Sequence, residues 1–175
     1  MKTKKILLPL ATLVAAGAIA VGSGATFTST SANTISSVTS GSLSQSNSKA
    51  NAAVFNLTNI KPGDVVNGSL TIKNTGSLPA TFSLTETAST NTFSGTNLAL
   101  TITNTTTNKV VYTGTFGGLV DGAKNDLGSV AAGVSNDYTF SVKLDQATPN
   151  TDQGKTASAA FQWDSIQADA TTTNQ

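Results

Sequence analysis

The clearest alternation in the chain is Tyr138-Thr139-Phe140-Ser141-Val142-Lys143-Leu144. Apolar and polar residues take turns over the whole stretch, so every second side chain falls on the same face. A period of two is typical of a β-strand with one buried face, whereas an amphipathic helix repeats its apolar residues about every 3.6 positions. The stretch therefore predicts a strand that buries its tyrosine, phenylalanine, valine and leucine.

The same alternation recurs from residue 53 to residue 167, with turn-forming residues between the segments. About seven or eight short strands with nothing helical between them favour two packed antiparallel sheets. We therefore expect an all-β protein with a single antiparallel β-sandwich over 53–167, jelly-roll-like, whose strand order the periodicity does not give. The expected inward rows are Phe55 and Leu57; Val66, Leu70 and Ile72; Ala80, Phe82 and Leu84; Leu98, Leu100 and Ile102; Val110, Tyr112 and Phe116; Leu127 and Val130; and Ala157, Ala159, Phe161 and Trp163.

Two turns have a characteristic sequence. In the run Lys61-Pro62-Gly63-Asp64, Pro presets φ at the second position and Gly accepts a positive φ at the third, which is the preferred chemistry of a type II turn. The run Asn74-Thr75-Gly76-Ser77 predicts the next reversal, since Asn and Gly are frequent turn residues. The expected structural turn residues are Pro62, Gly63, Asp64, Asn74 and Gly76.

The N-terminus has the three parts of a secretory signal. Lysines within the first five residues precede the apolar stretch 6–21, and small residues follow it. Signal peptidase requires small side chains just before the bond it cleaves, so residues 1–25 are predicted to form a signal helix that is removed between Ala25 and Thr26. The alternative is an uncleaved anchor, because the apolar stretch is slightly shorter than the roughly 20 residues that span a bilayer. Cleavage predicts a secreted protein that meets signal peptidase and the membrane only during export.

Residues 26–52 are polar and contain too few apolar residues to form a core of their own. Their threonine content and local alternation permit an extended strand, which would need a sheet edge as partner for its backbone groups. We therefore expect a flexible segment over 26–52 and a frayed polar tail over 168–175. The candidate donor-strand residues are Thr26, Phe27, Ser29, Ser31, Asn33 and Ile35.

Charge and composition exclude several function classes. After removal of the predicted signal, seven Lys remain against eight Asp and one Glu, a net charge of −2 with no Arg, so nucleic-acid binding is not expected. The sequence also contains no His and no Cys, which removes the usual general base, zinc ligands and catalytic triads. We therefore expect no enzymatic activity, no cofactor and no metal.

The remaining candidate residues have structural interpretations. Glu86 and the aspartates are expected to be solvated turn residues, since they show no paired spacing. An oxygen-ligand calcium site around Asp145, Asn150 and Asp152 is an alternative, although the spacing does not match an EF-hand. The pair formed by Phe161 and Trp163 is expected in the core rather than on a ligand-binding platform.

Four strings resemble the TasA/camelysin family of secreted proteins. The residues Gly22-Ser23-Gly24-Ala25-Thr26-Phe27 are similar to that family's specialised signal-peptidase site. The run from Phe55 to Asp64 resembles its Asn-x-x-Pro-Gly-Asp turn, and the run from Ile72 to Leu78 resembles its Asn-x-Gly-Ser reversal. Gln153-Gly154-Lys155-Thr156-Ala157, continuing to Gln167, resembles its Gln-Gly-Lys segment and closing strand. The matches occur in the family's order along most of the chain.

This resemblance implies an exported jelly-roll domain that assembles into extracellular fibres of a biofilm matrix or cell surface. In such fibres the N-terminal segment of one subunit completes a sheet of the next, so the implied partners are other copies of the chain or a related surface subunit. Some members carry a metalloprotease label, which is not transferred here because the sequence lacks His-Glu-x-x-His. The other hypotheses are an unconventional peptidase and a monomeric adhesin or carbohydrate-binding module, which would expose Trp163 and Tyr138.

Overall fold

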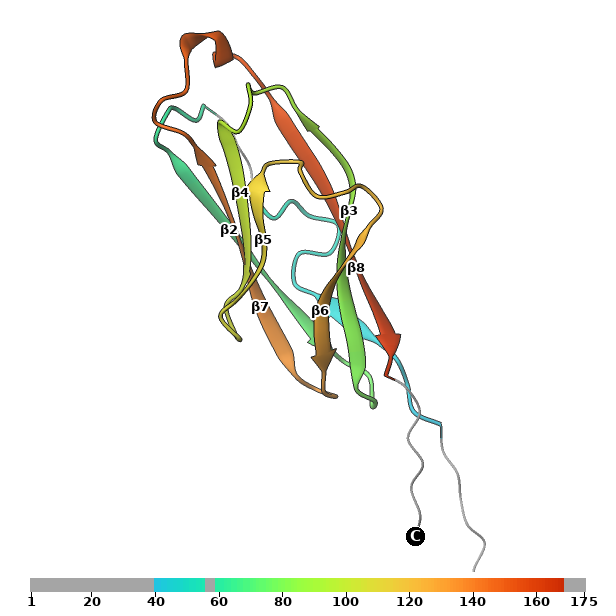
Figure 1. Ribbon diagram of the computed structural model, residues 1–175. Coiled ribbons are helices and arrows are strands. Elements are labelled where there is room, and N and C mark those ends of the chain that lie inside the picture. The colour runs from blue at the N-terminus through green and yellow to red at the C-terminus, as the bar shows by residue number, and fades with distance from the viewer. Residues whose placement is uncertain (1–39, 56–58, 169–175) are drawn as a thin grey trace, which may run out of the picture. The chain divides into compact units, whose positions relative to one another are not determined.

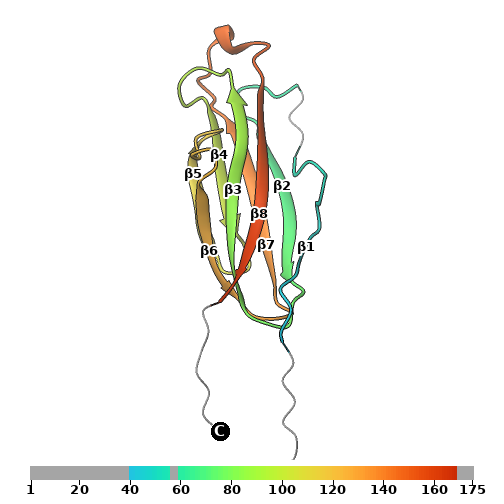
Figure 2. The same ribbon diagram turned by 90° about the vertical axis from the view of Figure 1, so that its right-hand side faces the viewer.

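The computed structural model describes residues 40–55 and 59–168, which form two antiparallel sheets packed face to face (Figures 1 and 2). This confirms the prediction of an antiparallel β-sandwich. The predicted signal segment, its cleavage site at Ala25 and Thr26, and the candidate donor residues up to Ile35 lie outside the described residues, as does the tail from residue 169. Within the described ranges, no helix is both long enough and apolar enough to cross a bilayer.

The sandwich contains eight strands in its described part, and consecutive strands mostly alternate between the two sheets. All pairings are antiparallel. The five-stranded sheet has the order β1 (Gln45–Asn47), β2 (Val65–Asn74), β7 (Ser135–Leu144), β4 (Leu98–Asn104) and β5 (Lys109–Thr115). The three-stranded sheet has the order β6 (Lys124–Val130), β3 (Ala80–Asn91) and β8 (Ala157–Gln167), and a short 3₁₀ helix, η1 (Asn150–Asp152), lies between β7 and β8.

The stretch 138–144 forms the last seven of the ten residues of β7, at the centre of the five-stranded sheet. Its four apolar side chains are buried, as the alternation predicts, and Thr139, Ser141 and Lys143 lie on the other face. Phe140 lies opposite Ile102 of β4 and Gly68 of β2. The inward rows of neighbouring strands therefore stand side by side, which is how a sandwich builds one continuous core.

Aromatic side chains join the two sheets in the middle of the core. Tyr138 and Trp163 have ring centroids 4.8 Å apart, and those of Phe140 and Phe161 are 5.1 Å apart. Each pair links β7 in one sheet with β8 in the other, so the pairs hold the sheets together as well as burying apolar area. The predicted core role of Phe161 and Trp163 is therefore correct.

Phe55 departs from the predicted pattern. It lies outside any strand, although a strand was expected there, and it packs against the core with its ring 6.0 Å from Phe116 and 6.3 Å from Phe140. Gly68 makes room for this segment, because a Cβ at that position would lie 2.3 Å from the carbonyl oxygen of Val54. The alternation around Phe55 thus reflects an irregular segment filling the core, and Leu57 lies outside the described residues.

Val110 was predicted to face inward but is 55% exposed. The reason is an irregularity between β4 and β5, where Ile102 pairs with Tyr112 but Thr103 pairs with Val110. One extra residue, Val111, is inserted at that point and packs against the core instead. A bulge of this kind shifts the alternation by one position, so the period-two rule fails at the end of the strand.

Candidate functional site

The outer edge of β8 is a candidate assembly site. This strand is 11 residues long and pairs with β3 only (Figure 2), so its other edge has no strand partner within the part of the chain that the structure describes. On that edge the carbonyl oxygen of Trp163 accepts a hydrogen bond of 2.8 Å from Gln45 Nε2. A long open edge offers backbone donors and acceptors to an added strand.

The direction of the Trp163 carbonyl identifies which other backbone groups face this edge. In an antiparallel ladder each residue directs its N–H and C=O to the same side, and successive residues alternate between sides. Because Trp163 directs its carbonyl away from β3, Ala159 and Phe161 also direct their backbone groups to the open edge. Their side chains are half-buried, so this edge presents, as far as residues 40–55 and 59–168 are concerned, backbone groups without a strand partner beside an apolar interior.

A groove of about 340 Å³ runs beside this edge. On one side it is lined by Leu70 of β2 and on the other by Ala159, Phe161 and Trp163 of β8. The segment 47–55 forms the rest of the lining. The groove therefore lies between β2 and β8, and among the described residues the segment 47–55 covers the seam there.

β1 covers a small part of the β2 edge. Its three residues pair with Ile72, Lys73 and Asn74, and the chain before it continues alongside the next turn, with Ser77 N–H donating to the carbonyl of Ser42 at 3.0 Å. This stretch belongs to the segment 26–52, whose described part thus reaches the sandwich and pairs with its edge. The candidate donor residues, which end at Ile35, precede this stretch in the sequence.

Asn74 ties together the turns at this end of the sandwich. The side chain is fully buried, and its Nδ2 donates to the carbonyl of Leu78 at 2.8 Å and to that of Val130 at 2.9 Å. Its Oδ1 accepts from Gly76 N–H at 3.0 Å. The sequence identifies Asn74 as a turn residue, but it gives no signal that the side chain links the β2–β3 turn to β6, because that contact spans 56 residues.

The Lys61–Asp64 turn lies at the opposite end of β2. Gly63 has φ 91°, and Asp64 N–H donates to the carbonyl of Lys61 at 3.0 Å, which closes the turn. The carboxylate of Asp64 accepts from the backbone N–H of Lys61 at 3.0 Å, and this bond is the main reason that the pKa of Asp64 is lowered. Gly63 N–H also donates to the carbonyl of Leu144, so the turn is anchored to the end of β7.

Asp152 is buried rather than solvated, which corrects the expectation for this residue. Its carboxylate accepts hydrogen bonds from the backbone and hydroxyl of Ser94 and from the side chain of Asn97. The bond from Asn97 is the largest cause of the lowered pKa of Asp152. The nearby Asp145 accepts from Ala147 N–H at 2.7 Å. Both carboxylates therefore brace loops in this structure, and the calcium alternative gains no support from them.

Glu86 is also buried, contrary to the expectation of a solvated residue. It has 0% exposure on β3, and neither carboxylate oxygen has a hydrogen-bond partner among the described residues. Burial, followed by the charge of Asp121, raises the pKa of Glu86. The sequence does indicate that Glu86 is buried, because Glu86 continues the inward row of Phe82 and Leu84 at a spacing of two.

A zinc centre of the metallopeptidase type needs about three protein ligands, usually imidazole, carboxylate or thiolate groups. The sequence contains neither His nor Cys. Over residues 40–55 and 59–168, no group of three or more carboxylates comes together. The carboxylate of Asp152 accepts hydrogen bonds from Ser94 and Asn97. Among the described residues, the one acidic residue whose charge raises the pKa of Glu86 is Asp121. The described residues therefore do not fit such a metal, and no catalytic step follows from them.

The aromatic row required by the carbohydrate-binding hypothesis is not at the surface. Trp163 is 8% exposed and Tyr138 is 1% exposed. Both rings lie between the sheets, where a sugar has no access to their faces. This arrangement counts against a binding platform built from these two residues.

Comparison with protein families supplies the identity that the geometry alone does not. The sequence model described as camelysin metallo-endopeptidase matches residues 2–97, which is more than half of the chain, and confirms the resemblance to the TasA/camelysin family. The comparison with curated proteins found no match. The description of the family contradicts the expectation that the protein is not an enzyme, because it implies a protease. The family also includes secreted matrix and surface proteins. The chain belongs to the camelysin metallo-endopeptidase family.

Proposed function

We propose that the protein is a secreted structural component of the cell surface or matrix, and that it assembles into fibres by strand donation. The N-terminal segment of one copy, with Thr26 to Ser36 as the donor, adds to the open edge of β8 in the next copy. The observation that carries this proposal is the 11-residue edge of β8 beside a groove that Leu70, Phe161 and Trp163 help to line. Membership of a family that includes secreted matrix and surface proteins supports the location.

The length of the donor matches the acceptor. Phe27 and Ile35 are eight residues apart, so they fall on the same face of an extended strand, separated by about 26 Å. An 11-residue strand such as β8 spans roughly 36 Å. A donor of this length therefore covers most of the open edge, with its two large apolar side chains toward the ends of β8 and small polar ones between them.

The donor has a physical reason to join a sheet. It is polar and poor in apolar residues, so it gains little from packing on itself. On the β8 edge, its backbone groups replace bonds to water with ladder bonds to Ala159, Phe161 and Trp163, and the donor strand covers the groove. The seam between the sheets becomes closed in the same step.

Electron microscopy of the exported protein tests this proposal. We expect filaments from the natural chain and monomers from a variant lacking Thr26 to Val38. A sharper variant is Ala159→Pro, which removes one outward N–H from the β8 edge while leaving the ladder to β3 intact. Its matched control is Ala159→Val, which keeps the N–H and should still assemble. Filaments from the deletion variant, or equal assembly by Ala159→Pro, would overturn strand donation at this edge.

A second candidate function is endopeptidase activity, which the description of the family favours. A casein-cleavage assay with and without a metal chelator tests it. Chelator-sensitive cleavage by the exported protein would establish a metallopeptidase, and the metal would then be sought with ligands that include residues outside the described ranges. Absence of cleavage at high protein concentration, with filaments present, would leave the structural role as the function of this chain.

A further inference from the structure

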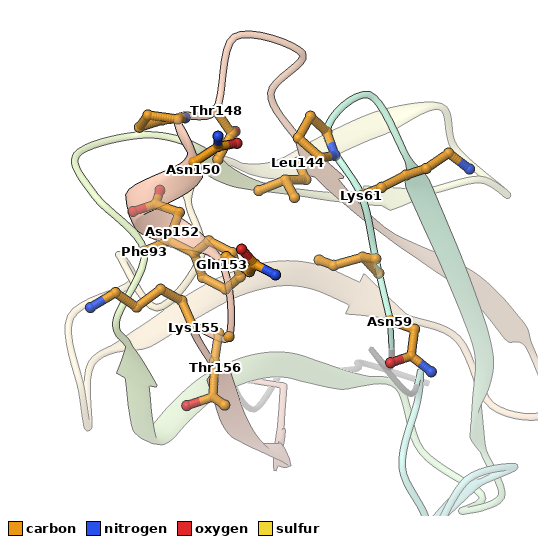
Figure 3. A pocket seen from close by; sticks show the side chains of 15 residues that line it. Asn59, Lys61, Phe93, Leu144, Thr148, Asn150, Asp152, Gln153, Lys155 and Thr156 are labelled. Carbon is orange, nitrogen blue, oxygen red and sulfur yellow. The ribbon is translucent and has the colours of Figure 1, made fainter.

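A second concave region lies at the end of the sandwich opposite the β2–β3 turn. This end pocket has a volume of about 820 Å³ and is formed where the Lys61–Asp64 turn, the β3–β4 loop and the β7–β8 loop meet (Figure 3). Its apolar lining includes Ile60, Phe93 and Leu144. Pockets that bind small ligands fall in the same range of volume, and they also combine apolar walls with a few polar groups.

The walls of the end pocket are braced by hydrogen bonds. Asp152 fastens η1 to the β3–β4 loop through Ser94 and Asn97. Thr92 and Thr156 exchange backbone and side-chain hydrogen bonds of 2.8 to 3.0 Å beside them. A site built on such fixed loops needs little rearrangement to bind, which lowers the entropic cost of association.

The charged groups of the lining are already engaged or turned aside. Lys61 Nζ lies 3.3 Å from Asp64 Oδ1, and the carboxylate of Asp152 is occupied by its loop contacts. Figure 3 shows the amine of Lys155 extending away from the middle of the pocket. The polar side chains that Figure 3 shows toward the middle of the pocket are therefore amides, which favours a neutral ligand over a strongly charged one.

Side-chain amides supply those uncharged groups. Figure 3 shows the amide of Gln153 in the middle of the lining and that of Asn150 at its rim, and both residues are exposed. An amide offers a donor and an acceptor at fixed spacing, which suits the neighbouring hydroxyl groups of a sugar ring. The half-buried ring of Phe93 and the side chain of Ile60 can take the apolar C–H face of the same ring.

A peptide is a poorer fit than a sugar. Strand addition needs a row of free backbone groups, but the backbones of Thr92 and Thr156 at this pocket pair with each other. From the apolar wall, the exposed amides and the direction of the Lys155 amine away from the middle, we propose that the end pocket binds neutral saccharide units of a polysaccharide. The end pocket meets the β8 edge only at Ala157, because Ala159, Phe161 and Trp163 line the groove and not the pocket.

The test is a titration of the exported protein with cellotetraose and chitotetraose, followed by NMR of the side-chain amides and by calorimetry. We expect saturable shifts at Gln153 and Asn150. Gln153→Ala should weaken binding about two- to tenfold, which corresponds to about one hydrogen bond. The matched control is Gln146→Ala, an exposed glutamine of the same loop that does not line the pocket, and it should bind like the natural chain.

Further arms separate this inference from the alternatives. Phe93→Ala should also weaken binding, and circular dichroism must show that it folds. A proline-rich heptapeptide serves as the competing ligand. No shifts with either tetrasaccharide, shifts unchanged by Gln153→Ala, or preferential binding of the heptapeptide would overturn the saccharide assignment. Filament formation by Gln153→Ala should stay normal, so failure of this inference is distinguishable from failure of strand donation.

Discussion

Replacing Asn74 with Ala should be among the most destabilising single changes in the sandwich. The substitution removes three hydrogen bonds, to the carbonyls of Leu78 and Val130 and to the N–H of Gly76, at a side chain with 0% exposure. Water does not reach these backbone groups readily, and each unsatisfied buried group costs about 1–3 kcal/mol. Because the turn can relax and recover part of this cost, we expect Asn74→Ala to lower the free energy of unfolding by about 3–5 kcal/mol.

Urea denaturation followed by tryptophan fluorescence measures this loss, since the chain has a single Trp, which lies in the core. With a typical slope of about 2 kcal/mol per M, the midpoint should fall by roughly 1.5–2.5 M. The control is Asn67→Ala on the same strand, because Asn67 is exposed and should change stability by no more than about 0.5 kcal/mol.

Asn74→Asp separates the donor role from the acceptor role. Aspartate keeps an acceptor for Gly76 N–H but cannot donate to Leu78 and Val130, and its charge would face two carbonyl oxygens. The variant should therefore be at least as unstable as Asn74→Ala at pH 7 and should recover when the carboxylate is protonated. A midpoint shift below about 0.5 M for Asn74→Ala would refute the reasoning, because it would mean that the side chain does not satisfy the turn.

Other substitutions test the buried carboxylates and the irregular segment. Because the pKa of Glu86 is raised in the folded protein, the stability of the natural chain should fall as pH rises above 4.5. Glu86→Gln removes this loss, so thermal unfolding should show a stabilisation by this variant that is small at pH 4 and grows toward pH 8. Because the pKa of Asp152 is lowered, Asp152→Asn should reduce the melting temperature at pH 7, and this reduction should shrink as pH falls below 3.8. A reduction that is unchanged at pH 2.5 would argue against the contacts of Asp152 with Ser94 and Asn97. Gly68→Ala should cost about 1–3 kcal/mol in urea denaturation by displacing Val54, whereas a neutral result would show that the segment moves freely.

Period-two alternation predicted most of the core because most strands run without interruption. The rows in β3, β4 and β7 are buried as expected, since a half-buried strand leaves a direct record in the sequence. The rule failed at Val110, where a bulge shifts the register, and at Phe55, where an irregular segment mimics a strand. Both failures depend on partners distant in the sequence, which a local pattern does not contain.

The candidate sites were less accessible to sequence reasoning than the core. The end pocket is assembled from three loops whose residues lie up to about 100 positions apart, so no motif marks it. Glu86 shows the opposite problem, because its inward position was readable from Phe82 and Leu84, but its charge favoured a solvated interpretation. A carboxylate can be buried either when its pKa rises, as at Glu86, or when hydrogen bonds hold its charged form, as Ser94 and Asn97 do at Asp152.

The two proposed interactions occupy different parts of the sandwich, and this has a consequence for fibres. The segment before residue 45 lies at the β2–β3 turn, where Ser42 and Ser77 share hydrogen bonds, while the end pocket lies at the far end of β2 and β7. β8 runs between these ends, beginning at Ala157 beside the pocket. A donor strand that covers β8 therefore reaches the rim of the pocket in the accepting copy. If the donor strand enters from the pocket end of β8, saccharide binding and assembly compete at the rim of the pocket. Tetrasaccharide should then slow filament growth without affecting finished filaments.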